Sequence, residues 1–160
     1  MPEPFKRPYL DSSVYISAIK GEGAEPGRGD VSAQVLDLAR QGNFVVVAST
    51  FVVAEVIKDR GRPELTGPEE AAIDGYLEHG FIQWVEVDLL IARKARDLSR
   101  QHKLKPGDAV HLATAIRGGC DQLLAWDGGF PNGMEIEGVT CNEPHLVGLP
   151  QPLEGFPDER

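Results

Sequence analysis

Apolar residues along the chain follow two patterns, continuous runs and helical spacing. The run FVVVAS (44–49) is apolar almost throughout, which is typical of a strand buried on both faces of a parallel sheet. Within 31–39, apolar residues recur at i, i+4, i+7 and i+8, the spacing of one helix face. Over the whole chain, these patterns predict strands at 7–11, 44–49, 81–87 and 120–126, and a weaker strand near 138–141. They predict helices at 12–20, at 30–41, from 49 or 50 through Glu55, and at 66–79, 88–103 and 108–117.

Strands that alternate with helices predict an α/β protein with a mainly parallel sheet. We expect a three-layer α/β/α sandwich with four or five strands. The 160 residues suffice for one ordinary domain with a real core. We place this domain at residues 1–143 and expect the Pro-rich, acidic segment 144–160 to form a C-terminal tail on the surface.

Composition narrows the protein class. Hydrophobic residues make up 41% of the chain and charged residues 26%, which predicts a soluble globular protein. No apolar run approaches the roughly 20 residues of a membrane span, and MPEPFKRPYLD does not resemble a signal peptide. We therefore expect a cytoplasmic protein with no membrane partner. Cys120 and Cys141 form no CxxC spacing and are expected to be buried, reduced thiols.

Four acidic residues, far apart in sequence, fall at one predicted edge of the sheet. Asp11 ends the first strand, Glu55 lies in the second turn of the helix after the second strand, Asp108 begins the helix before the fourth strand, and Asp127 ends that strand. In alternating strand–helix units, the carboxyl ends of strands and the amino ends of helices share one edge, where ligands bind. The predicted topology therefore brings these four side chains together.

Each acid also has an ordinary structural interpretation. Asp11 and Asp108 are suited to capping helices, Asp127 in WDGGF to forming a turn, and Glu55 in FVVAEVI to facing solvent from a narrow polar face. Together, however, four converging carboxylates would repel one another. Mg²⁺ or Mn²⁺ would relieve that repulsion, because both prefer carboxylate and water oxygens.

A metal held by carboxylates supports phosphodiester hydrolysis by activating water and stabilising charge on the attacking and leaving oxygens. The sequence contains no Walker loop, HExxH motif or Ser–His–Asp order that would favour another chemistry. The net charge of -9 does not favour binding to nucleic acid by the chain as a whole. A polyanionic substrate would therefore need a local basic surface or bound cations.

Four segments resemble the signature segments of PIN-domain ribonucleases, most closely the VapC-type toxins of toxin–antitoxin pairs. They are YLDSSVYI (9–16), ASTFVVAEVI (48–57), KPGDAVHLATAI (105–116) and LLAWDGGF (123–130), and the resemblance extends over about 7–143. It implies a Mg²⁺- or Mn²⁺-dependent endoribonuclease that forms a homodimer and is inhibited by a cognate antitoxin. One departure is Trp126, at a position where the family more usually has a small polar or basic residue.

The resemblance also implies roles for individual residues. Asp11, Glu55, Asp108 and Asp127 match the acidic quartet that binds the metal and cleaves RNA. Ser12 matches a small hydroxyl residue that helps to position water or phosphate.

Three features have competing interpretations. His111, three residues after Asp108, is suited to orienting a carboxylate or moving a proton, and equally to a packed, hydrogen-bonded place in the core. The basic segment 92–105 is either an RNA-contacting surface or a solvated helix face; its candidate contact residues are Arg93, Arg96, Arg100, Lys103 and Lys105. The alternative to an enzyme is a catalytically silent PIN-like module that binds RNA or protein.

Overall fold

The computed structural model describes residues 2–56, 67–78, 80–126 and 129–150. Its elements, in chain order, are β1 (Pro8–Leu10), α1 (Ser12–Lys20), α2 (Gly29–Arg40), β2 (Val46–Ser49), α3 (Phe51–Glu55), α4 (Gly67–Leu77), β3 (Ile82–Val85), α5 (Leu89–His102), α6 (Pro106–Arg117), β4 (Gln122–Leu124), β5 (Glu135–Ile136) and β6 (Val139–Asn142). This order matches the predicted alternation of strands and helices, with one strand added.

The strands form one sheet in the order β3-β2-β1-β4-β6-β5. The pairs β1–β2, β1–β4, β2–β3 and β4–β6 are parallel, and among the described strands only β5 runs antiparallel, to β6. The predicted fold class is therefore confirmed. The described sheet has six strands where four or five were expected, because the two-residue β5 is too short to produce a recognisable alternation in sequence.

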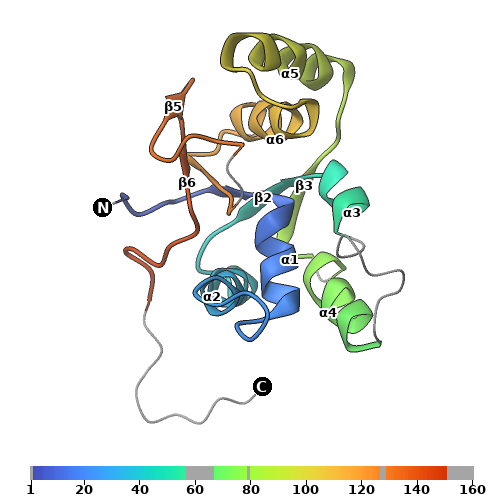
Figure 1. The fold of residues 1–160 in the computed structure, drawn as a ribbon, viewed down its shortest axis with the longest axis vertical. Helices are drawn as coiled ribbons and strands as arrows, with labels where there is room; N and C mark the ends of the chain where they lie inside the picture. Colours follow the sequence, from blue (N-terminus) through green and yellow to red (C-terminus); the bar gives the residue numbers. More distant parts are fainter. Residues whose placement is uncertain (1, 57–66, 79, 127–128, 151–160) are drawn as a thin grey trace.

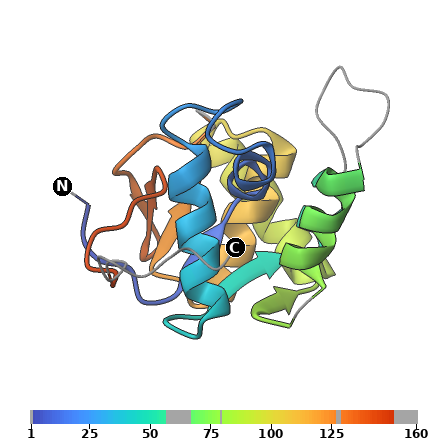
Figure 2. The same cartoon turned by 90° about the horizontal axis from the view of Figure 1, so that it is seen from below.

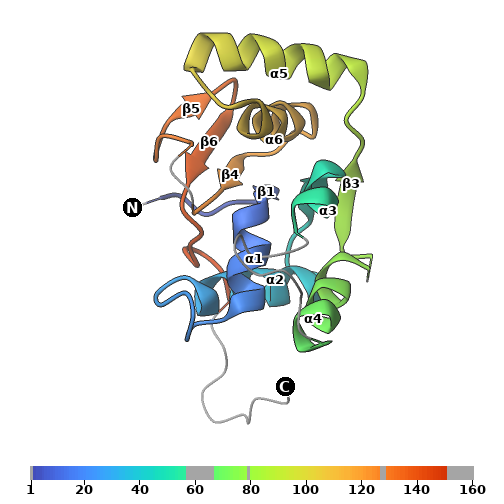
Figure 3. The ribbon, with the colours of Figure 1, turned by 45° about the vertical axis from the view of Figure 1, so that its right-hand side comes forward.

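Helices cover both faces of the sheet (Figure 1). Helices α5 and α6 lie on one side, and α5 runs over the sheet from the β3 side toward β5 and β6 (Figure 3). Helices α1, α2 and α4 lie on the other side, which faces the viewer in Figure 2. The three predicted layers are all present.

Side chains that alternate along the strands build a separate core on each face. Tyr9 of β1 and Leu123 of β4 belong to the core under α5 and α6. Their neighbours Leu10 and Leu124 belong to the core under α1, α2 and α4. All four side chains are fully buried, so the central strands are fixed from both sides.

Strand β1 lies at the point where the strand order reverses. From β1 the chain builds outward to β2 and β3, and then returns to place β4 on the other side of β1. The backbone N–H of Asp11, just beyond β1, donates a hydrogen bond to the carbonyl of Leu124 at 3.0 Å. In open α/β sheets such a reversal at the carboxyl edge is where ligands bind.

Two predicted helix starts have different outcomes. Asp88 caps α5 as predicted, accepting a hydrogen bond from the Ile91 N–H at 2.8 Å. The prediction that Asp108 begins its helix is wrong: α6 begins at Pro106, with Lys105 at the N-cap position. Proline is well suited to the first helical position, where its missing N–H costs nothing, so the helix starts two residues earlier. Asp108 lies in the first turn.

The segment 144–150 lies against the domain. Leu146 and Leu149 pack against the core on the α1 and α2 side, and the ring centroids of His145 and Phe5 are 5.2 Å apart. The remainder of the predicted tail, 151–160, is outside the described residues, and the domain boundary at 143 stays a prediction. Among the helices that the structure describes, none has the length and apolar character needed to span a membrane.

Both cysteines are buried free thiols, as predicted. Burial raises the pKa of Cys120 to about 12 and that of Cys141 to about 11. Because the thiolate is the reactive form, we expect the native protein to react slowly with Ellman's reagent near neutral pH. In the denatured protein, both thiols should react with the reagent. Rapid labelling of either cysteine in the native protein would contradict this placement.

Candidate metal site at the carboxyl edge of the sheet

Asp11 caps α1, as its ordinary structural interpretation predicts, and its side chain also reaches the candidate site. Its Oδ2 accepts a hydrogen bond from the Ser13 N–H at 3.1 Å and so caps α1. Its Oδ1 lies 3.4 Å from Nε2 of His111. The side chain is 9% exposed. The capping bond therefore fixes the carboxylate while its second oxygen faces the interior of the site.

Glu55 is the last residue of the five-residue helix α3. Its Oε1 lies 2.5 Å from Nε2 of His111, and its side chain remains 31% exposed. The carboxylate within the apolar run FVVAEVI thus has a protein partner, which is a histidine. Because Oε1 is engaged, Oε2 is the oxygen that remains for another ligand.

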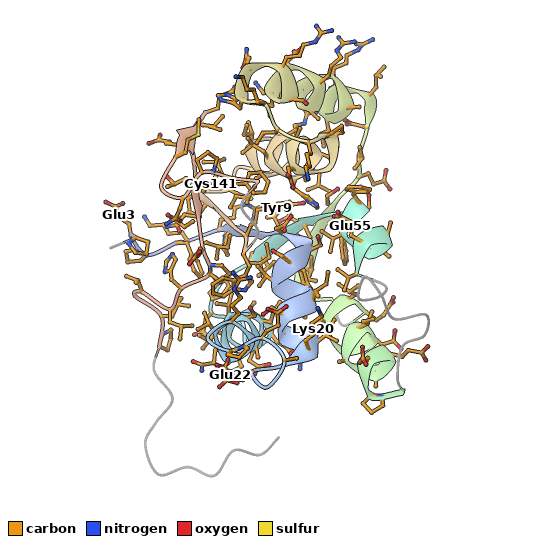
Figure 4. The ribbon with its side chains drawn as sticks, in the orientation of Figure 1. Glu3, Tyr9, Lys20, Glu22, Glu55 and Cys141 are labelled. Carbon is orange, nitrogen blue, oxygen red and sulfur yellow. The ribbon has the colours of Figure 1, made fainter. Side chains whose placement is uncertain are left out.

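His111 lies one turn after Asp108 on α6 and is 1% exposed. Its Nδ1 lies 2.6 Å from Oη of Tyr9, and that Oη also accepts a hydrogen bond from the Ser49 N–H at 3.2 Å. The two interpretations of His111 are compatible, since the residue is packed and hydrogen-bonded and also contacts Glu55. Figure 4 shows Tyr9 between α1 and α6, and Glu55 to one side of them on α3.

Asp108 is electrostatically linked to the other acids. Burial raises its pKa above the ordinary value, and the negative charges of Asp11 and Glu55 raise it further, against the effects of His111 and Lys105. Burial alone would lower the pKa of His111, but the hydrogen bond to Glu55 and the charges of Asp11 and Asp108 raise it overall. The negative charges of the neighbouring acids contribute to both shifts, whereas burial raises the pKa of Asp108 and opposes the shift of His111.

Asp127 lies outside the described residues, but its neighbours on both sides are described. The Trp126 N–H donates to Oγ of Ser13 at 3.0 Å. Two residues beyond Asp127, a methyl group built on Gly129 would lie 2.2 Å from Oδ2 of Asp108. The described residues on the two sides of 127–128 therefore lie next to Ser13, whose N–H bonds to Asp11, and against Asp108.

Trp126, the departure from the family pattern, has a structural explanation. Its indole N–H donates to Oγ of Ser32 at 2.7 Å, and the guanidinium of Arg28 lies 5.3 Å from the ring centroid. The ring packs against the core on the α1 and α2 side. Trp126 therefore anchors the end of β4 to α2.

The remaining candidate residues lie on α1, on α5 and on the segment that follows α5. Ser12 is buried at the first position of α1, beside Asp11. The neighbouring Ser13, which was not predicted, makes the bond to Trp126. The candidate RNA-contacting side chains are exposed on α5 and the segment that follows it, namely Arg93, Arg96, Arg100, Lys103 and Lys105.

Sequence reasoning missed four residues of the site: Tyr9, Ser13, Ser49 and Gly129. Tyr9 carried a usable signal, because it precedes Asp11 by two positions at the end of a strand, where alternate residues share a face. Ser49 contributes its backbone N–H, which sequence does not reveal. The closeness of Gly129 to Asp108 likewise follows from the path of the chain.

The donors present fit a small, hard cation. Within the described residues, no three or more His, Cys, Asp or Glu side chains lie close enough together to hold one metal ion as a group. Mg²⁺ does not require such a cage, because it keeps several waters and is commonly bound by one or two carboxylates. Asp11, Asp108 and Glu55 offer carboxylate oxygens whose mutual repulsion a cation would reduce.

The fold and the site define a class: an α/β/α sandwich with an acidic site at the carboxyl edge of a parallel sheet. The family model for the PIN domain matches residues 9–132. The chain belongs to the PIN-domain family. A search of the curated proteins found no match.

Two solved structures share this fold. One is VapC20 of Mycobacterium tuberculosis, described as a sarcin-ricin loop cleaving toxin, with 18% identity over 76% of this chain and 90% of that one and a TM-score of 0.58. The other is VapBC2 of Rickettsia felis, bound to a DNA fragment from its promoter, with 17% identity over 74% and 86% and a TM-score of 0.53.

The closeness of Gly129 to Asp108 generates a prediction. In Gly129→Ala, the new methyl group forces the Asp108 carboxylate to turn away from the site, because Oδ2 would lie 2.2 Å from it. We expect affinity for Mn²⁺, measured by calorimetry, to fall about tenfold, the lower end of losses when carboxylate positioning is disturbed. The unfolding temperature should change little, since the end of the Asp108 side chain can move.

Gly75→Ala is the matched control, because a methyl group at this helical position meets nothing within 4 Å. It should bind Mn²⁺ as the unmodified protein does. Equal Mn²⁺ affinity in the Gly129 and Gly75 variants would show that Asp108 is not placed to bind the ion.

Proposed function

We propose that the chain is a Mg²⁺- or Mn²⁺-dependent endoribonuclease of PIN type and the toxin of a toxin–antitoxin pair. The observation that carries the proposal is the meeting of Asp11, Glu55 and Asp108 around His111 at the carboxyl edge of the sheet. Membership of the PIN family supports it. The shared fold with VapC20, described as cleaving the sarcin-ricin loop, is consistent with RNA as the substrate.

In this proposal Asp11, Glu55, Asp108 and Asp127 hold the cation, directly or through water. When bound, the metal would activate water and stabilise the charge that develops on the phosphate oxygens. Asp11 is oriented by its capping bond to Ser13, and Glu55 by His111. Asp127 is included because its neighbours Trp126 and Gly129 lie against Ser13 and Asp108. Ser12, next to Asp11, would help to position water or phosphate.

The exposed basic residues of α5 and its C-terminal extension would contact the RNA backbone. Lys103 and Lys105 immediately precede α6, whose first turn carries Asp108, so the basic surface leads toward the acidic site. A chain of net charge -9 needs such a local surface to hold a polyanion near its carboxylates.

A cognate antitoxin and a second copy of the chain are the proposed protein partners, and the cytoplasm is the proposed location. The VapBC2 structure from Rickettsia felis supports an antitoxin partner by fold similarity. Val87, Leu89 and Leu90 are exposed large apolar residues at the start of α5 and are suited to a protein contact.

A second candidate is a PIN-like module that binds RNA or protein without cutting. It is favoured by one observation: His111 already contacts both Glu55 and Asp11, so these carboxylates are stabilised without a metal. The two candidates differ in whether the cluster supports cleavage.

Substituting the carboxylates tests the enzyme. With Mn²⁺ and generic single-stranded RNA, we expect cleavage that EDTA abolishes and that added Mn²⁺ restores. Asp11→Asn and Asp108→Asn should each reduce the cleavage rate by about two orders of magnitude or more, since each removes charge that stabilises the transition state. A gel assay of end-labelled RNA gives the rates.

Asp30→Asn is the matched control, because Asp30 is an exposed aspartate in the first turn of α2. It should cleave normally. Purified protein that binds RNA but shows no metal-dependent cleavage would favour the binding module.

Reversing charge on α5 tests the substrate surface. Arg96 and Arg100 are four residues apart on α5 and therefore share one helix face. The double variant Arg96→Glu/Arg100→Glu should weaken RNA binding and reduce its dependence on salt, because fewer phosphates are neutralised. Fluorescence anisotropy over a range of salt concentrations measures both effects.

The matched control is Lys6→Glu/Arg117→Glu, which changes the net charge equally. Both residues are exposed, and they lie beside the amino end of β1 and at the last residue of α6. If the two double variants lose affinity and salt dependence to the same extent, α5 has no special part in RNA binding.

A further inference from the structure

We propose that Tyr9 and His111 are positioning residues that hold the Glu55 carboxylate ready for the cation, through a continuous hydrogen-bonded chain from strand β1 to helix α3. The inference rests on the proposed function and adds a positioning role for two residues that lie behind the metal-binding acids.

The direction of each hydrogen bond follows from the donors available. The Ser49 N–H can only donate, so Oη of Tyr9 accepts from it. The Tyr9 hydroxyl is then free to donate its own hydrogen to Nδ1 of His111, 2.6 Å away. This leaves the ring proton on Nε2, which donates to Oε1 of Glu55. The network thus assigns the Nε2–H form to the neutral ring.

Tyr9 is suited to be the fixed end of this chain. It is fully buried in a central strand that pairs with β2 and β4 on either side. Burial raises the pKa of its hydroxyl well above the ordinary value, so the group keeps its hydrogen across the physiological range. Tyr9 is therefore able to donate to His111 whenever the ring is neutral and Nδ1 is an acceptor.

His111 is held in place by its surroundings as well as by Tyr9. The ring centroids of Tyr9 and Phe51 lie 5.6 Å and 5.7 Å from that of His111. Phe51 is the first residue of α3, the helix that ends at Glu55. His111 therefore contacts both ends of α3, and it does so from α6, which also carries Asp108.

Glu55 needs such support because α3 is short. A helix of five residues has little stability of its own, and a glutamate side chain loses rotamer freedom when it is fixed. The bond from His111 fixes the carboxylate before a metal arrives. With Oε1 held, Oε2 is presented to the cation. The Glu55 side chain therefore loses less conformational entropy when the cation binds.

Removing the Tyr9 hydroxyl tests this positioning role. In Tyr9→Phe the His111 ring loses its donor, and we expect affinity for Mn²⁺, measured by calorimetry, to fall about tenfold, as is typical when a partner of a metal-ligating group is removed. Tyr15→Phe is the matched control. Tyr15 is also fully buried, but its hydroxyl has no hydrogen-bond partner among the described residues, so affinity should stay within about twofold.

A pair of His111 variants separates hydrogen bonding from packing. His111→Gln keeps an N–H donor near the position of Nε2 and should retain most of the Mn²⁺ affinity. His111→Leu keeps apolar bulk but has no donor, and its Mn²⁺ affinity should fall to the same extent as that of Tyr9→Phe. Equal affinity of the Gln and Leu variants would overturn the proposal.

The His111 ring can also be observed directly in the unmodified protein, so this test does not depend on whether a variant folds. At alkaline pH, nitrogen–proton correlation spectra should show the neutral His111 ring protonated on Nε2. A ring protonated on Nδ1, or Mn²⁺ affinity unchanged in Tyr9→Phe, would refute the positioning role while leaving the nuclease intact. Absence of Mn²⁺ binding by the unmodified protein would instead refute the proposed function, and the inference with it.

Discussion

Repulsion between carboxylates is the constraint on which the site depends. Asp11, Glu55 and Asp108 come from three different elements and meet in a partly buried place, where negative charges interact strongly. The folded chain opposes this repulsion with directed donors: the Ser13 N–H for Asp11 and Nε2 of His111 for Glu55. These donors fix one oxygen of each carboxylate and leave the other available, so the remaining negative charge faces the centre of the site.

The sheet makes this crowding possible, because its central strand cannot easily move. Strand β1 is paired on both sides and packed on both faces, and the backbone N–H of Asp11 is bonded to the end of β4. The Trp126 N–H, which bonds to Ser13, ties the end of β4 to α1. A rigid scaffold of this kind can hold like charges together, because the packing of the two cores offsets the free energy of their repulsion.

Several of these features follow from sequence and several do not. Alternating apolar runs and helical spacing predict the fold class and place Asp11, Glu55 and Asp108 at one edge, because parallel topology leaves few other arrangements. The prediction that α6 starts at Asp108 is wrong, because the preference of Pro106 for the first helical position outweighs the capping preference of Asp108. The chain through Tyr9 and His111 depends on how α6 packs against β1, which no local pattern encodes. The role of Asp127 stays a prediction.

The energetics of the buried network bear on whether the cluster serves only the fold. Removing a histidine and several carboxylates from water is costly, and apolar residues of similar volume often stabilise a protein as well or better. A purely structural core at this edge would therefore gain little from Tyr9, His111 and Glu55 in hydrogen-bonded contact. An arrangement that fixes one carboxylate oxygen and presents the other is, by contrast, what cation binding requires. This reasoning supports the proposed metal-dependent enzyme rather than the silent module.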